Sequence, residues 1–301
     1  MRMCDAHCDT MMKIDIGEKF DFSFEKAASC GGFLQIFACF TEDGEKDAYF
    51  AAVRKIKNFT DFLKTKDNCF LAYTPCAAKK ITDSGGLAAV LSLENCACLG
   101  DEPENLYKFY NLGVRVITLT WNEANSFASG CYEKGGLTKR GRELLRIAGK
   151  LGILVDVSHI NEQGFYEILS EGTCKIFASH SSCAALENNP RNLTDLQILK
   201  IYSHGGIVCA CPNPPFLNGK NEAEKSDFAK HLRHILKLTD GMGAGIGSDC
   251  DGTAFCCNGL KTTGDYIDFR NFLKEKHFEN YEIQNIFSCN FERFFNIFDK
   301  K

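Results

Sequence analysis

The stretch LTKRGRELLRIAGKLGILVDVSH, residues 137–159, contains one complete helix-and-strand unit of the predicted fold. Its first part has a helical pattern, with Thr138 suited to the N-cap and Gly152 to the C-terminal stop. Its second part, residues 153–159, is a short apolar run typical of a buried strand, and it ends on His159. The stretch therefore predicts a helix followed by a buried strand with a histidine at its carboxyl end.

The same alternation of apolar runs and amphipathic stretches continues along nearly the whole chain. Eight runs are predicted as strands: 4–9, 33–40, 87–94, 114–121, 153–159, 175–181, 206–212 and 243–249. A further run at 69–74 is predicted as an extra hairpin strand. Helices are predicted at 46–64, 137–152, 193–206 and, with an aromatic face packed inward, at 281–298.

Each predicted strand is almost continuously apolar, which favours a parallel sheet covered by helices on both faces. Eight strand-and-helix units suggest a closed (β/α)₈ TIM-like barrel, and an open doubly wound sheet is the alternative. The Gly-rich turn of dinucleotide-binding sheets does not follow the first strand, and no Walker sequence occurs. Because no internal repeat or linker is visible, we expect a single domain over residues 1–301 with additional C-terminal helices.

Composition narrows the possible partners. The 301 residues are 45% hydrophobic and 25% charged, with a net charge of −4. No cluster of Lys and Arg suggests a nucleic-acid partner, and no apolar run is long enough to span a membrane. We find no charged-then-apolar leader ahead of the first polar motif and expect a cytoplasmic protein.

The chain has 17 cysteines, which raises the question of disulfides or thiolate metal sites. The odd number, the length of the chain and the lack of a C-x-x-C pair favour reduced thiols. Several cysteines stand where a buried strand would otherwise carry Ala or Val, as in 36–40 and 206–212. We therefore interpret most of them as small core residues, with metal ligation as the alternative.

Polar side chains stand at the carboxyl ends of the predicted strands, where barrels of this kind carry their chemistry. His7 and Asp9 are two residues apart, so on a strand they share one face. His159 and His180 end neighbouring strands, which lie about 4.8 Å apart. Imidazole and carboxylate groups suit a divalent metal such as zinc. The candidate metal or acid–base residues are His7, Asp9, Glu94, His159, His180 and Asp249.

Each of these residues has an ordinary structural alternative. His7 and Asp9 could be a chance pair in a surface turn, and His159 could be a core histidine with its polar atoms satisfied. Glu94 could cap a helix, and Asp249 could shape the turn at 249–252. All of these alternatives would have to hold together for the site to be absent, so the set favours a functional site.

The motifs resemble those of the renal (membrane) dipeptidase family, zinc peptidases of the amidohydrolase-like barrel group. DAHCDT (5–10) is similar to the family's D-G-H-N-D opening, and LSLEN (91–95) to its I-E-G-G strand end. Residues 136–159 resemble its G-L-T…I-D-x-S-H stretch. Further similar motifs are FASHSS (177–182), PRNL (190–193), GIGSDCDG (245–252) and SCNFERFF (288–295).

The resemblance implies two zinc ions per chain. His7 and Asp9 would bind the first ion, His159 and His180 the second, and Glu94 would bridge them. Paired metals can hold a water between them as hydroxide, which would attack the peptide carbon.

Two further roles follow from the resemblance. Asp249 would move the proton from the attacking water to the leaving amine. Arg191 would bind the C-terminal carboxylate of a dipeptide through a charge-assisted pair.

One position departs from the family pattern. Renal members carry a histidine after L-T-L-T that supports the oxyanion, whereas this chain has Trp121 there. Trp121, Asn122 or Asn125 could supply a neutral donor in its place, or the metal could carry most of that stabilisation. Trp121 could equally be a wall of the pocket, and we count Trp121 and Asn125 as candidate substrate contacts.

These observations give a hypothesis and two alternatives. The hypothesis is a metallo-dipeptidase that hydrolyses dipeptides, both L,L and L,D, and that forms a homodimer as family members often do. The first alternative is a degenerate paralogue that binds zinc or a peptide without turnover. The second is a barrel hydrolase of another amide or of a lactone.

Overall fold

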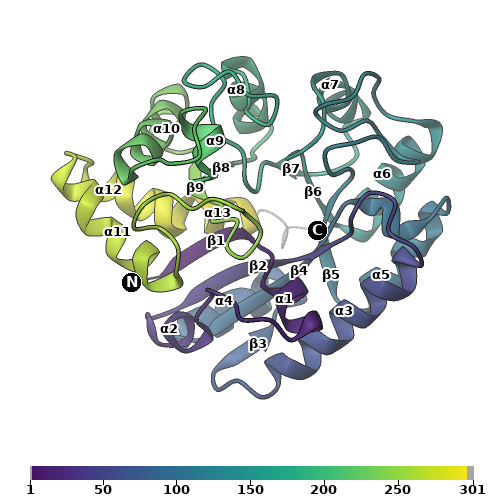
Figure 1. The fold of residues 1–301 in the computed structure, drawn as a ribbon, viewed down its shortest axis with the longest axis horizontal. Helices are drawn as coiled ribbons and strands as arrows, with labels where there is room; N and C mark the ends of the chain where they lie inside the picture. The colour runs from purple at the N-terminus through teal and green to yellow at the C-terminus, as the bar shows by residue number, and fades with distance from the viewer. Residues whose placement is uncertain (1, 297–301) are drawn as a thin grey trace.

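A computed structural model describes residues 2–296 as a ring of parallel strands surrounded by helices (Figure 1). The strands are β1 (Met3–Cys8), β2 (Phe33–Phe40), β3 (Cys69–Leu71), β4 (Leu87–Glu94), β5 (Val114–Thr118), β6 (Leu154–Asp156), β7 (Ile176–Phe177), β8 (Val208–Ala210) and β9 (Ala244–Ile246). All eight predicted strands and the extra one are present, although several are shorter than predicted. The prediction of an α/β barrel is confirmed.

The barrel closes through weaker pairing at two places. Strands β1, β2, β4, β5, β6 and β7 form one parallel sheet in that order, and β8 pairs with β9 in a second. A bridge between Ala178 and Val208 joins β7 to β8, and a bridge between Cys8 and Cys250 joins β9 to β1. The unit β8–β9 is therefore attached to the rest of the ring by one isolated bridge on each side.

The extra strand β3 corrects one part of the prediction. It was expected to form a hairpin, but it pairs with β4 in parallel, with Cys69 opposite Leu87. The prediction of a hairpin is wrong because a long helix precedes β3. This helix, α3 (Ala48–Leu63), has 16 residues and returns the chain to the start of the sheet. A strand that begins after such a return runs in the same direction as its neighbours.

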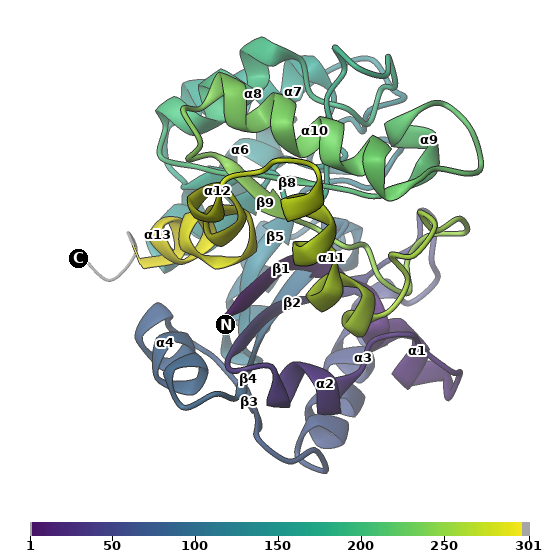
Figure 2. The ribbon, with the colours of Figure 1, turned by 90° about the vertical axis from the view of Figure 1, so that its left-hand side faces the viewer.

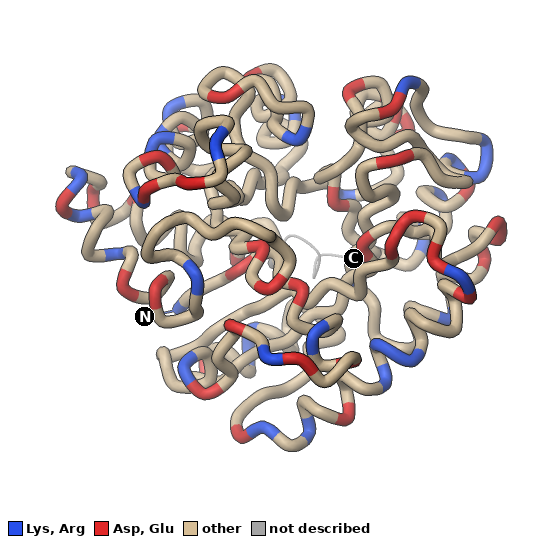
Figure 3. The backbone as a smooth tube through the Cα atoms, in the orientation of Figure 1, with Lys and Arg blue, Asp and Glu red and all other residues tan. Residues whose placement is uncertain are grey.

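Helices cover the outer face of the sheet between successive strands. They are α1 (Thr10–Ile16), α2 (Phe24–Ser29), α3, α4 (Pro75–Asp83), α5 (Leu106–Asn111), α6 (Lys139–Leu151), α7 (Glu162–Glu171), α8 (Asp195–Ser203), α9 (Pro214–Leu217), α10 (Lys225–Leu238), α11 (Thr263–Glu275), α12 (Asn280–Gln284) and α13 (Asn290–Asn296). Charges of both signs are interspersed over them (Figure 3). Within residues 2–296, none of these helices combines the length and the apolar character needed to cross a bilayer.

Local sequence explains the ends of α6. The Thr138 hydroxyl accepts a hydrogen bond from the Gly141 N–H at the start of the helix. Gly152 ends the helix in the left-handed conformation, with φ of 68°, which glycine adopts without steric cost. The predicted cap and stop are both confirmed.

The interior of the barrel is filled by alternate strand residues and closed at one end by aromatic rings. Phe291, Phe294 and Phe295 of α13 pack in one buried cluster with inward-facing residues such as Leu34 and Val90. Figure 2 shows α13 and α4 at one end of the strands and α1 and α9 at the other. The predicted terminal helix at 281–298 is present up to Asn296, with a π-helical turn at Asn285–Cys289; positions 297 and 298 lie outside the described residues.

Free thiols account for all 17 cysteines, and most of them are buried. Burial raises the pKa of thiols such as those of Cys39 and Cys209 well above the ordinary value of a cysteine. These thiols therefore stay neutral. The interpretation of most cysteines as core residues agrees with this placement.

Candidate metal centre

The six candidate metal or acid–base residues lie together at the carboxyl ends of the barrel strands, and all are buried. They are His7 in β1, Asp9 directly after it, Glu94 at the end of β4, and His159, His180 and Asp249 in the turns after β6, β7 and β9. Residues as far apart in the sequence as His7 and Asp249 therefore meet in one place, as the strand-end argument predicts.

Glu94 lies between two groups of ligand atoms. Its Oε2 is 3.3 Å from His7 Nε2, and its Oε1 is 3.1 Å from His159 Nε2. On the first side, His7 Nε2 is also 3.4 Å from Asp9 Oδ2 and 3.9 Å from Asp249 Oδ1. On the second side, His180 Nε2 is 3.7 Å from Glu94 Oε1. The two carboxylate oxygens thus face different sets of nitrogens.

The second group brings together the Nε2 atoms of His159 and His180. His159 Nδ1 lies 2.9 Å from Asn122 Oδ1, an acceptor, so Nδ1 carries the hydrogen and Nε2 has a free lone pair. His180 Nδ1 lies 2.6 Å from Ser179 Oγ, and the two Nε2 atoms are only 2.8 Å apart. Burial lowers the pKa of both imidazoles well below the ordinary value, and nearby positive charge adds to the effect. Neutral lone pairs directed at one another and at a carboxylate are stabilised by a cation among them.

The first group also fits a cation. His7 Nε2 and Asp9 Oδ1 are buried and make no hydrogen bond, and leaving such atoms unpaired is costly. Burial alone would lower the pKa of His7, but the carboxylates of Glu94 and Asp9 raise it well above the ordinary value. The carboxylates therefore require positive charge here, as a proton on His7 or as a metal ion. Nitrogen and oxygen ligands in this number suit zinc or a similar divalent ion.

The turns that carry His159 and Asp249 are tightly constrained. His159 and Asp249 both have a left-handed backbone, with φ of 68° and 54°, which is uncommon for residues other than glycine and recurs at functional sites. Gly252 lies so close to the carboxylates that a Cβ there would be 2.0 Å from Asp9 Oδ2. The turn at 249–252 thus needs glycine because it packs directly against the Asp9 carboxylate.

Strands β6 and β7 end before His159 and His180. The strands predicted at 153–159 and 175–181 are therefore longer than the observed ones. Asp156 Oδ1 accepts hydrogen bonds from the Ser158 and Ser179 N–H groups, each 2.9 Å away. Those N–H groups are therefore not available for hydrogen bonds between β6 and β7, so both strands end early. His159 and His180 consequently sit in turns rather than on the last strand residues.

Arg191 lies beside the second group. Its guanidinium is buried, with Nη2 3.2 Å from the His180 carbonyl oxygen and Nη1 3.4 Å from Ser181 Oγ, while its Nε makes no hydrogen bond. Arg191 and His159 both line a cavity of about 220 Å³. A second cavity, of about 460 Å³, opens beside Asp249 on the other side. Space for a small molecule therefore adjoins the candidate centre at His159 and at Asp249.

Trp121 and Asn125 occupy different environments. Trp121 is half-buried, with its ring 5.2 Å from Phe40 and 6.4 Å from His159, centroid to centroid. Asn125 is engaged within its own loop: its amide donates to Asn95 Oδ1 and to the Leu119 carbonyl oxygen, and its oxygen accepts from two backbone N–H groups. The position of Trp121 agrees with a wall of the site, whereas the bonds of Asn125 hold the turn that follows Glu94.

Three residues with clear contacts to the ligands were not assigned these roles from the sequence. Asn122 was considered only as an oxyanion donor, yet it accepts from His159. Asp156 and Ser179 were not singled out, although Ser179 contacts His180. Two features of the sequence could have pointed to Asp156 and Ser179. They are a carboxylate inside the apolar run ILVDV and a serine directly before each of the two histidines.

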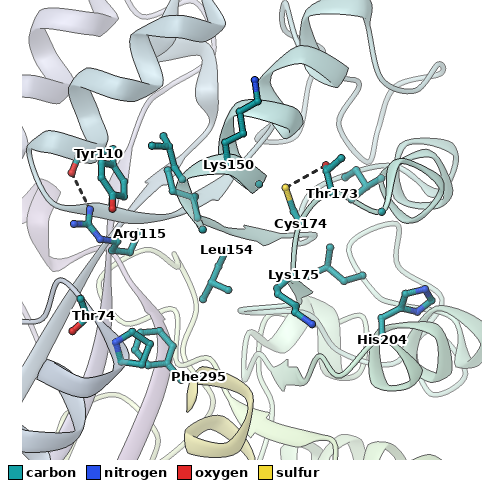
Figure 4. Close-up of a pocket in the computed structure, with 18 of the residues that line it drawn as sticks. Thr74, Tyr110, Arg115, Lys150, Leu154, Thr173, Cys174, Lys175, His204 and Phe295 are labelled. Carbon is teal, nitrogen blue, oxygen red and sulfur yellow. Dashed lines mark hydrogen bonds between the residues drawn. The ribbon is translucent and has the colours of Figure 1, made fainter. Parts of the chain in front are cut away.

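A larger cavity, of about 680 Å³, lies at the opposite ends of the strands (Figure 4). Leu154 and Ile176, the first residues of β6 and β7, line it together with Phe295. Its cationic side chains Lys150 and Lys175 are exposed and point in different directions in the figure. This cavity is separate from the metal centre.

Comparisons with known proteins show the family of this chain and its fold. The family model described as membrane dipeptidase (peptidase family M19) matches residues 1–300. The chain is 26% identical over 256 residues to the dipeptidase verJ of Clonostachys rogersoniana, covering 81% of this chain and 65% of that protein. It is 28% identical over 279 residues to an uncharacterized dipeptidase of Schizosaccharomyces pombe, covering 85% and 67%. The chain therefore spans about two thirds of the length of these relatives.

A solved structure is similar over nearly the whole chain. It is a metallo peptidase from Rhodobacter sphaeroides liganded with a phosphinate mimic of the dipeptide L-Ala-D-Ala. The TM-score is 0.91, the identity is 19%, and the match covers 98% of this chain and 99% of that one. At this identity the comparison shows the shared fold.

Proposed function

Because this chain belongs to the membrane dipeptidase family, we propose that it hydrolyses the peptide bond of dipeptides at this centre with two zinc ions. The observation that carries the proposal is the convergence of buried imidazole nitrogens and carboxylate oxygens on both sides of Glu94. His7 and Asp9 would hold one ion, His159 and His180 the other, and Glu94 would contribute one oxygen to each.

Zinc bound there would supply Lewis acidity, which polarises a carbonyl and makes water acidic at neutral pH. Asp249 would handle the proton. It is the most exposed carboxylate of the six-residue centre, with a side chain 12% exposed, and burial raises its pKa to about 7 in the metal-free site. A carboxyl group with a pKa near the working pH can accept a proton from water and then give it to the leaving amine.

Arg191 supports a substrate with a free carboxylate. Its guanidinium carries a fixed charge, and its unpaired Nε and the adjoining cavity leave room for a further acceptor. The similar Rhodobacter sphaeroides structure carries a mimic of L-Ala-D-Ala. We extend the proposal to dipeptides with either an L- or a D-residue at the C-terminal position.

The test of this proposal is amino-acid release from a panel of L,L- and L,D-dipeptides. The protein is assayed as purified, after chelation, and after zinc is returned. Turnover that is lost on chelation and restored by zinc is expected. Zinc bound without turnover of any dipeptide would contradict the proposal and favour a non-catalytic binding protein. Trp121, in place of the family histidine, would then be the residue to test as the cause of the lost activity.

Substitution of Arg191 by lysine should weaken dipeptide cleavage selectively. Lysine keeps the charge but not the planar pair of donors, so we expect kcat/KM to fall about 10–100-fold, as for loss of a charged hydrogen bond. Assays should compare a dipeptide with its C-terminal amide. The two enzymes should differ little on the amide, which lacks the carboxylate. An equal loss on both substrates would show that Arg191 acts on the fold of the site instead.

A further inference from the structure

The Ser179 hydroxyl occupies a central position beneath the metal centre. Its Oγ is 2.6 Å from His180 Nδ1, 2.5 Å from Asp156 Oδ2 and 3.5 Å from His7 Nδ1. All four residues are buried, with at most 2% of their surface exposed. His7, Asp156 and His180 alone would look like a further metal site, since their ligand atoms lie within 4.8 Å of one another. The hydroxyl fills that space, so the group is a hydrogen-bonded network.

The direction of each bond in this network follows from the chemistry of Asp156. A carboxylate can only accept, and Asp156 accepts from the Ser158 and Ser179 N–H groups and from the Thr118 and Ser179 hydroxyls. Ser179 has one hydroxyl hydrogen, and it is directed at Asp156. Towards His180 the Ser179 oxygen can therefore only accept, which places the ring hydrogen on Nδ1 and leaves Nε2 free.

We propose that Asp156 and Ser179 are positioning residues that fix the tautomer of His180, so that its Nε2 is available to a metal ion. The proposal rests on the metal centre proposed above. Histidine ligands commonly donate their second N–H to a carboxylate, which orients the ring and sets its tautomer. Here a serine stands between the two groups and transmits the direction of hydrogen bonding from the buried carboxylate.

Replacement of Asp156 by asparagine reverses this direction without changing shape. The asparagine oxygen still accepts from the Ser158 and Ser179 N–H groups, and the new NH₂ donates to the hydroxyls of Thr118 and Ser179. All four contacts remain, so the fold should be kept. The Ser179 hydrogen is now free to point at His180 Nδ1, which places the ring hydrogen on Nε2 and blocks the ligand atom.

The direct test is ¹⁵N NMR of the histidine side chains in metal-free protein, which distinguishes the two ring tautomers. The wild-type protein should show His180 protonated on Nδ1, and Asp156→Asn should show it protonated on Nε2. An unchanged His180 signal in Asp156→Asn would overturn the inference. Because no metal is present, this result does not depend on whether the protein is a dipeptidase.

The second readout is zinc affinity, measured by competition with a chelator. Asp156→Asn and Ser179→Ala should each weaken zinc binding about 10–100-fold. Ser182→Ala is the matched control, because its buried hydroxyl donates only to the Cys211 carbonyl oxygen, and its affinity should stay close to that of the wild type. Equal losses in all three variants would mean that the effect is general destabilisation and would contradict the inference.

Ser179→Ala also covers the case in which Asp156→Asn does not fold. Without the hydroxyl, His180 loses the acceptor on Nδ1, and its NMR signals should show both tautomers. A single Nδ1-protonated form in this variant would contradict the inference. If the wild-type protein binds no zinc, the proposed function fails, while the NMR comparison still decides the role of Asp156.

Discussion

Substitution of Glu94 by glutamine should abolish most of the activity by removing metal. One carboxylate oxygen faces His7 and the other faces His159 and His180. Glutamine replaces one of these oxygens by an NH₂ group, which cannot ligate a metal, so only one side of the centre keeps its full set of ligands. Loss of metal assistance costs several kcal/mol, so kcat/KM should fall by at least about 10³-fold.

Metal analysis of the Glu94→Gln protein separates this cause from misfolding. The variant should retain at most one zinc ion, against two in the wild type, and it should still show the circular dichroism of the folded protein. Glu45→Gln is a control with the same change in net charge, because Glu45 pairs with Lys55 away from the ligands. A Glu94→Gln protein that holds two zinc ions and cleaves dipeptides normally would exclude a bridging role.

Substitution of Asp249 by asparagine should lower activity about as much as Glu94→Gln does. The cause should be the loss of proton transfer, with the metal retained. Asparagine cannot carry the proton from water to the leaving amine, so kcat should fall about 10²–10⁴-fold. The five other residues of the centre remain, and zinc content should stay at the wild-type value. Asp251→Asn is the control in the same turn, since Asp251 bonds to Thr10 and to the Asp21 N–H.

The pH profile gives an independent check on Asp249. Its carboxyl must be unprotonated to accept a proton, so kcat/KM should rise with pH as Asp249 ionises. Burial raises its pKa from 3.8 to about 7 in the metal-free site, and bound cations would lower it again. The acidic limb of the wild-type profile should therefore lie between these values and should be absent from Asp249→Asn. An unchanged acidic limb in the variant would assign the proton transfer to another group.

The fold was predictable because its signal is repeated. Continuous apolar runs between amphipathic helices mark each barrel strand, and the carboxyl ends of parallel strands must share one edge. This placed the six candidate residues of the centre together before any contact was known. The hairpin prediction for 69–74 failed because a short apolar run does not indicate its direction; the long helix before it decides that.

The parts that could not be predicted depend on hydrogen bonds between side chains. Asn125 was proposed as a substrate contact from its position near Trp121, but its bonds to Asn95 and to its own loop depend on a conformation that no pattern encodes. Asp156 sits in an apolar strand, and its partners include Thr118 at the end of β5 and Ser179 in the turn after β7. The pattern of apolar residues shows that such a carboxylate is buried. Only the folded structure shows which hydrogen-bond donors reach it.

The two isolated bridges that attach β8–β9 to the barrel place the six residues of the centre on two parts of the ring that are joined by little backbone pairing. His7 and Glu94 lie on strands of the continuous sheet from β1 to β7, and Asp9, His159 and His180 follow strands of that sheet, whereas Asp249 follows β9. Sparse backbone pairing lowers the cost of local opening. Across this seam the Asp249 N–H donates to the His7 carbonyl oxygen and the Asp9 N–H donates to the Cys250 carbonyl oxygen. These two bonds keep the carboxylate that would shuttle the proton beside the residues that would bind the metal.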